Sequence, residues 1–157
     1  MIRYILIVLL AIAIFIPTVQ AQESFESTAC VSGTMNVVHG SKELLISSMD
    51  VKGIVMSDTK SEILNNVSEW CVGLFTKKGE EIIQSGYCKY VYSTGDINII
   101  EWDGKTEGGN WKFIMGTGKW EGIKGGGTWN ISQRVKSVAP ETFQNCRKIK
   151  GTYELPK

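Results

Sequence analysis

Short alternating segments separated by glycine-containing turns are the feature that most constrains the fold of this chain. Turn sequences such as Asp103-Gly104 and Gly108-Gly109 fall between most of these segments. After residue 21, no stretch keeps the apolar spacing of an amphipathic helix for three turns. We predict eight strands, at 31–38, 43–52, 67–75, 82–92, 96–102, 110–116, 127–134 and 149–155. Such a series of strands is typical of a closed barrel or, alternatively, of a β-sandwich.

Alternation within two segments favours the barrel. Trp111, Phe113 and Met115 share one face of 110–116, and Trp129 shares a face with Ile131 in 127–134. One dry and one wet face is the pattern of an antiparallel sheet closed around a core. We therefore predict an all-β fold, a single eight-stranded antiparallel barrel of the calycin-like kind, with short helical turns at 61–64 and 140–147.

The first 21 residues have the pattern of a signal peptide. Arg3 precedes an apolar run of about 13 residues, which is short for a membrane span of about 20 residues. Val19-Gln20-Ala21 has the residue types of a peptidase site. We predict that residues 22–157 form one domain, secreted or periplasmic, without membrane association after cleavage.

Four cysteines agree with an oxidising compartment. A two-residue turn at Gly79-Glu80 places Cys71 opposite Cys88, close enough for a disulfide. Elimination then pairs Cys30 with Cys146. In a simple meander of the predicted strands this second pair lies at opposite ends of the barrel. Either the 136–148 connection crosses one end, or the strand count is off by one.

Charge and motif patterns exclude several function classes. Without Arg3, the chain after the leader has 16 basic and 16 acidic residues, so its net charge is zero, which argues against nucleic-acid binding. The glycines of 104–127 do not match a phosphate-binding loop. His39 is the only histidine and no C-x-x-C occurs, so we expect neither a metal nor a cofactor.

The stretch 116–129 reads Gly-Thr-Gly-Lys-Trp-Glu-Gly-Ile-Lys-Gly-Gly-Gly-Thr-Trp. It resembles the glycine-rich hairpin of the allene oxide cyclase-like and dirigent-like small β-barrels, which include uncharacterised secreted bacterial proteins. The resemblance covers about a tenth of the predicted domain. It implies a small antiparallel barrel with an apolar cavity, often homo-oligomeric, in which some members steer the cyclisation or coupling of reactive apolar intermediates. No position here matches the functional acids of that family.

Few side chains are candidates for acid–base chemistry. His39 lies before Gly40 and is interpreted as an exposed turn residue. Glu101 and Asp103 share one strand face, a spacing compatible with glycoside hydrolysis, but we interpret them as a strand leaving the core toward its turn.

The leading hypothesis is a binding module that holds a small apolar molecule inside the barrel. The candidate lining residues are aromatic or large apolar side chains on predicted inward faces: Tyr90, Trp111, Phe113, Met115 and Trp129. An isomerase or cyclase using the same cavity is the alternative, and it needs an inward acid or base such as Glu101 or His39. A structural or protein-interaction module is the third reading.

Overall fold

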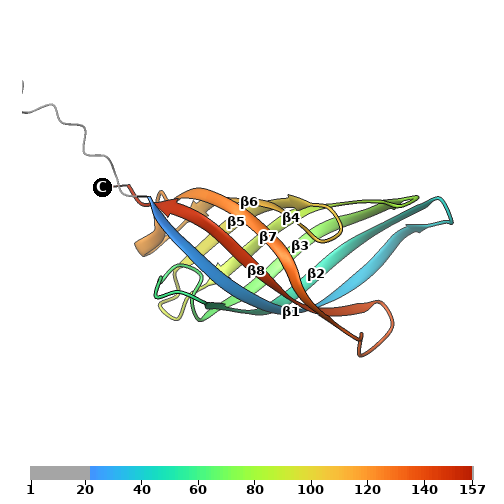
Figure 1. The fold of residues 1–157 in the computed structure, drawn as a ribbon, viewed down its shortest axis with the longest axis horizontal. Helices are drawn as coiled ribbons and strands as arrows, with labels where there is room; N and C mark the ends of the chain where they lie inside the picture. Colours follow the sequence, from blue (N-terminus) through green and yellow to red (C-terminus); the bar gives the residue numbers. More distant parts are fainter. Residues whose placement is uncertain (1–21, 157) are drawn as a thin grey trace, which may run out of the picture.

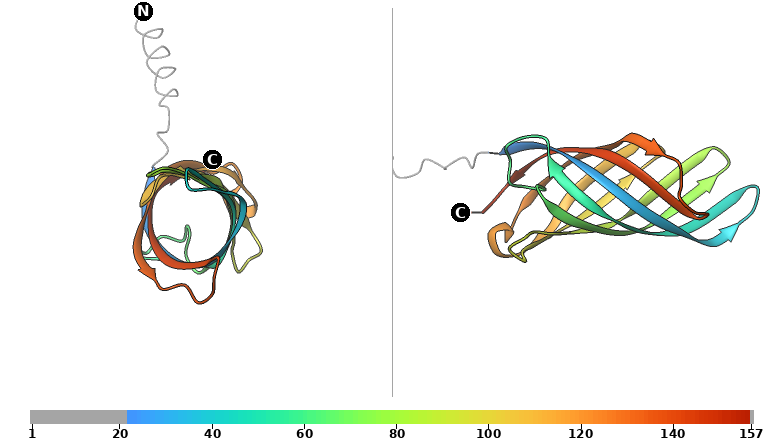
Figure 2. Two further views of the ribbon diagram at one scale, coloured as in Figure 1. Left: turned by 90° about the vertical axis from the view of Figure 1, so that its right-hand side faces the viewer. Right: turned by 90° about the horizontal axis from the view of Figure 1, so that it is seen from below.

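The computed structural model describes residues 22–156, which form one closed barrel of eight antiparallel strands (Figures 1 and 2). Each strand pairs with the next in the chain, and the last pairs with the first. The predicted barrel is therefore confirmed, and the sandwich alternative is not. The predicted signal peptide lies outside the described residues. The strands are β1 (Glu23–Gly40), β2 (Leu44–Ser57), β3 (Val67–Lys78), β4 (Glu81–Val91), β5 (Ile97–Gly104), β6 (Gly108–Gly116), β7 (Lys124–Val135) and β8 (Thr142–Glu154).

The strands at the two chain ends are longer than predicted, and this resolves the cysteine problem. β1 begins at Glu23 and β8 at Thr142, so Cys30 and Cys146 are directly opposed within a continuous ladder. Both predicted disulfides, Cys30–Cys146 and Cys71–Cys88, are present. The turn at Gly79 places Cys71 opposite Cys88, as predicted.

Both predicted helical turns are wrong. Segment 61–64 belongs to an irregular loop in which Ile63 and Leu64 are fully buried, because the loop folds across one end of the barrel. Most of 140–147 belongs to β8, where pairing with β1 outweighs the local preference of Pro140 for a helix start. The 3₁₀ turn η1 (Gly118–Trp120) is the helical element of residues 22–156, and none of these residues forms a helix long and apolar enough to cross a bilayer.

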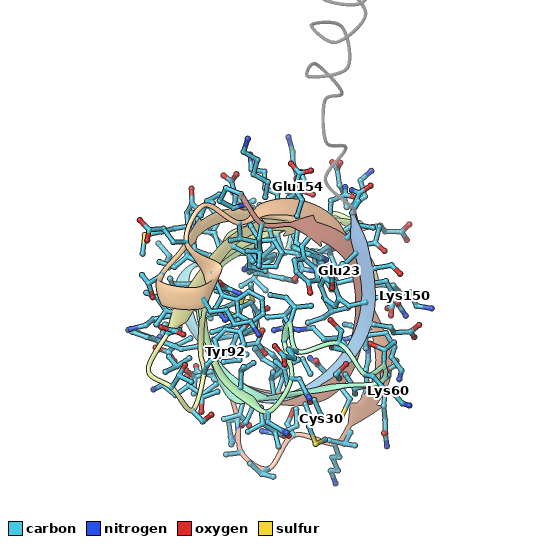
Figure 3. All side chains as sticks on the ribbon, turned by 90° about the vertical axis from the view of Figure 1, so that its left-hand side faces the viewer. Glu23, Cys30, Lys60, Tyr92, Lys150 and Glu154 are labelled. Atoms are coloured by element: carbon cyan, nitrogen blue, oxygen red, sulfur yellow. A yellow bond between two sulfur atoms is a disulfide. The ribbon has the colours of Figure 1, made fainter. Side chains whose placement is uncertain are left out.

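One end of the barrel, which we call the closed end, is covered by the 58–66 loop and η1. Tyr92 links these two covers: its hydroxyl accepts hydrogen bonds from Leu64 N (3.2 Å) and Asn98 Nδ2 (2.8 Å), and its ring packs on Trp120 at 5.0 Å between centroids. Figure 3 looks onto this end, with Tyr92 inside the ring and Lys150 on the outer wall. Solvent therefore has little access to the core from this side.

Tryptophans fill much of the barrel interior because glycines make room for them. Trp102 lies over the opposed pair Gly73 and Gly86, where an added Cβ would lie 2.8 and 2.9 Å from its Cζ2. Trp111 lies over Gly151 in the same way, at 2.5 Å. A strand glycine thus provides the space that a bulky ring on a neighbouring strand occupies. The nine-residue spacing of the tryptophans places three indoles inside the barrel and Trp120 in η1.

We predict that the two disulfides differ in their resistance to reduction. Cys71 and Cys88 are 1% and 2% exposed, whereas Cys30 and Cys146 are partly exposed on the outer wall. Because exchange requires attack by an external thiolate, a mild dithiol should reduce Cys30–Cys146 first in the folded protein. Alkylation followed by peptide mass spectrometry measures this order. Equal labelling of all four cysteines without denaturant would contradict it.

Candidate functional site

Three adjoining cavities follow one another from the end opposite the closed end into the barrel. The largest, which we call the mouth, has a volume of about 520 Å³. It shares Met49, Gln84, Ile131, Phe143 and Asn145 with a middle cavity of about 50 Å³. The middle cavity in turn shares lining residues with an inner cavity of about 20 Å³; these are Trp102, Trp129 and Arg147. The shared walls place these cavities in a row from the mouth toward the centre of the molecule.

The wall of the mouth is largely apolar, and its rim is charged. Side chains from six strands form the apolar part: Met35, Met49, Phe75, Ile82, Ile131 and Phe143. At the rim, Arg134 Nη2 lies 2.9 Å from Glu107 Oε1, so these two charges neutralise each other. An apolar concavity with a few polar groups is the usual character of a small-molecule site.

A buried ion pair lies beyond the middle cavity. Glu69 on β3 is 3% exposed, and its Oε1 accepts hydrogen bonds from Arg147 Nη2 of β8 and from the Tyr90 hydroxyl of β4 at 2.9 Å. Arg147 lines both the middle and the inner cavity. Glu69 is therefore the anchor of the pair, and Arg147 is the member that faces the cavities.

Burial and charge set the protonation states of this group. Burial raises the pKa of Tyr90 well above its ordinary value, and the negative charge of Glu69 raises it further. Burial, the largest single influence, would lower the pKa of Arg147, but attraction to Glu69 and Tyr90 and the hydrogen bond to Glu69 together outweigh it, so that this pKa lies above its ordinary value. Tyr90 is thus a neutral hydrogen-bond donor, and Arg147 keeps its charge inside the barrel.

The Cys71–Cys88 disulfide lies directly beside the ion pair. The Cys71 sulfur is 3.3 Å from Glu69 Oε1 and 3.6 Å from Arg147 Nη2. Cys88 lines the inner cavity and Cys71 the middle one. The disulfide therefore fixes β3 to β4 where these strands supply Glu69 and Tyr90.

Three of the five predicted lining residues line a cavity, but not the large one. Tyr90, Trp111 and Trp129 line the inner cavity. Phe113 is buried in the core and is not part of the lining of the three cavities. The predicted aromatic lining is thus mostly packing, and the space for a ligand lies nearer the mouth.

Met115 does not line the barrel, and its predicted inward orientation is wrong. Its side chain is 43% exposed on the outer wall. The register explains this: Ile99 pairs with Met115 and the next residue, Ile100, pairs with Phe113, so Ile114 is the extra residue of a β-bulge. A bulge reverses the alternation beyond it.

The candidate acids and base named from the sequence lie outside. Glu101 forms an ion pair with Lys112 at 2.7 Å and accepts a hydrogen bond from Tyr87, and these contacts lower its pKa. Asp103 and His39 are exposed, although His39 lies in β1 and not in a turn. Neither Glu101 nor His39 can therefore serve chemistry inside the barrel.

The sequence reasoning missed Glu69 and Arg147. The inward orientation of Glu69 could have been predicted, because Glu69 alternates in phase with Val67 and Cys71 and so shares their inward face. The inward orientation of Arg147 could not have been predicted, since its segment was interpreted as helical and carries no apolar alternation around it.

Comparisons with known proteins show the fold. No family model and no curated protein matches this chain. The solved pterocarpan synthase dirigent protein GePTS1 is similar, with a TM-score of 0.52, 10% identity, and coverage of 87% of this chain and 93% of that chain. A second, PsPTS1, gives a TM-score of 0.51, 16% identity, and coverage of 87% and 96%. At these identities the likeness extends to the eight-stranded barrel alone, which agrees with the dirigent-like fold that the glycine-rich hairpin implied.

We predict that Arg147→Met destabilises the protein by about 3–5 kcal/mol, because it leaves the Glu69 carboxylate buried without its partner. The double variant Glu69→Gln/Arg147→Met should lose less stability, since it leaves no unpaired charge in the interior. Denaturant unfolding of the wild type, both single variants and the double variant measures the coupling. Additive losses would show that the pair does not interact as described.

Proposed function

We propose that this barrel binds a small, largely apolar molecule in its mouth. The supporting observation is the cavity of about 520 Å³ that opens at one end and continues into the polar floor at Arg147. Burial of apolar ligand surface against Met49, Phe75 and Phe143 would supply most of the affinity, at roughly 25 cal/mol per Å² before the entropy of association is subtracted.

The charges around the mouth support an uncharged ligand. The loops and strand ends at this end carry Lys42, Lys77, Lys78, Lys105, Arg134 and Lys136, which are matched in number by Glu43, Glu80, Glu81, Asp103, Glu107 and Glu141. Such a rim creates no single-sign field that would steer a strongly charged molecule into the cavity.

The isomerase or cyclase alternative has weaker support. It requires a base in contact with the ligand, and Glu69 is the buried carboxylate of the described chain. Glu69 is, however, not part of the lining of the three cavities, and its Oε1 already holds Arg147 and Tyr90. Its geometry supports a role in positioning Arg147.

Filling the mouth should weaken binding. Ile82→Trp enlarges a side chain of the mouth wall, whereas Ile114→Trp makes the same change on the outer face of β6, at a residue that is 49% exposed. We expect the affinity for the neutral fluorescent probe N-phenyl-1-naphthylamine to fall about tenfold in the first variant, a loss of about 1.4 kcal/mol, and to stay unchanged in the second. Equal affinities in both variants, or no binding by the wild type, would refute the proposal.

A second candidate function, self-association, has its own supporting observation on the outer wall. Apolar side chains gather on β2, β3 and β4, among them Ile54, Trp70, Val72, Leu74, Ile83 and Tyr87, all exposed. Val72 lies directly opposite Tyr87 in the ladder, so these side chains are continuous across strands. Exposed patches of this kind mark interaction sites. We propose that this wall contacts a second copy of the chain.

Leu74→Lys should then convert an oligomer to a monomer, because it places a charge in the apolar wall at a side chain that is 55% exposed. Thr128→Lys, on the exposed face of β7, is the matched control and should leave the mass unchanged. Light scattering coupled to size exclusion reports the mass. A monomeric wild-type protein at high concentration would refute self-association.

A further inference from the structure

We propose that the ligand of the mouth is an uncharged molecule that carries one hydroxyl group, and that this hydroxyl enters the middle cavity between Trp102, Arg147 and Asn145. This inference rests on the proposed binding function and names the chemical class that the site selects. It is carried by polar atoms that the protein itself leaves without partners.

Trp102 differs from the other indoles of the barrel interior. Trp111 Nε1 donates to Thr128 O at 3.2 Å, and Trp129 Nε1 donates to Asp103 O at 3.0 Å. Trp102 Nε1 is buried and has no acceptor within the described chain. Buried N–H groups are nearly always paired, because an unpaired one costs about 1–3 kcal/mol. Because Trp102 also lines the middle cavity, we infer that a group bound there becomes the acceptor for this N–H.

Asn145 supplies the complementary acceptor. Its Oδ1 is also buried without a partner among residues 22–156, and its side chain lines both the mouth and the middle cavity. Trp102 and Arg147 line the same middle cavity. The walls of this small space thus hold donors and an acceptor together, and a hydroxyl is the smallest ligand group that both accepts and donates.

The ion pair decides the charge of the ligand. Arg147 already compensates Glu69, so the pair is neutral as a unit. A carboxylate in the middle cavity would add a second negative charge near Glu69, and an ammonium group would add a second positive charge near Arg147. Either ion would lose its hydration without gaining a free counter-ion. An uncharged polar group avoids this penalty.

The sizes of the two spaces fix the orientation of the ligand. A cavity of about 50 Å³ accommodates a polar head group, and the apolar body must then lie in the mouth of about 520 Å³. The two spaces meet at Asn145, Met49 and Phe143. The hydroxyl therefore enters first, and the body remains near the rim.

Three probes of one shape test this proposal: 2-naphthol, 2-methylnaphthalene and 2-naphthoate. Each competes with N-phenyl-1-naphthylamine near neutral pH, where only the naphthoate is charged. We expect the wild type to bind 2-naphthol about tenfold more tightly than 2-methylnaphthalene, because only the hydroxyl satisfies the buried groups. The naphthoate should bind more weakly than either neutral probe.

Asn145→Leu removes the amide at nearly constant volume. We expect it to reduce the naphthol preference to about twofold or less while 2-methylnaphthalene binds at least as well as before. Trp102→Phe is a second variant that removes the indole N–H and should also lower the preference. Asn110→Leu, on the exposed face of β6, is the control and should keep the wild-type ratio.

The outcomes separate this inference from the proposal beneath it. Equal wild-type affinities for 2-naphthol and 2-methylnaphthalene would refute the hydroxyl site and leave apolar binding in place. A preference that persists in both Asn145→Leu and Trp102→Phe would also refute it. If neither the reporter nor any naphthalene binds, the mouth is not a ligand site and both proposals fail.

Discussion

Pairing of the first strand with the last is the constraint on which the rest of this structure depends. The β1–β8 ladder runs from Glu23 opposite Tyr153 to Thr34 opposite Thr142, and the Cys30–Cys146 disulfide lies within it. Closure removes the free strand edges that an open sheet would expose. Closure also creates the barrel interior, to which β8 contributes Arg147 and Asn145. Without this seam there would be no enclosed ion pair and no cavity floor.

The interior is divided into a packed half and an open half. Toward the closed end, Trp111 lies over Gly151, and the 58–66 loop adds Ile63 and Leu64. Toward the mouth, the lining side chains leave a large space between them. The Glu69–Arg147 ion pair and the Cys71–Cys88 disulfide lie where the two halves meet. The ion pair joins β3 to β8, and the disulfide joins β3 to β4. A rigid polar floor under an apolar chamber is the arrangement that can discriminate between ligands of similar shape.

The sequence predicted those features that depend on residues close together in the chain. Alternation identified the strands, and the turn at Gly79 gave the register that places Cys71 opposite Cys88. The first eight residues of β1 and the start of β8 were missed because their polar or mixed composition gains strand structure only from mutual pairing. Met115 was misplaced because a bulge depends on the partner strand. Arg147 could be located only once β8 was known to face β3 across the barrel interior, since its partner Glu69 lies 78 residues away in the sequence.

Both ends of the described chain emerge at the closed end, on the side of the molecule away from the mouth (Figure 1). Glu23 and Glu154 both lie there (Figure 3). A carrier, a solid support or a fused domain attached through either terminus would therefore leave the entrance facing outward. The geometry makes this barrel suited to display on a surface with its opening directed toward the surrounding solution.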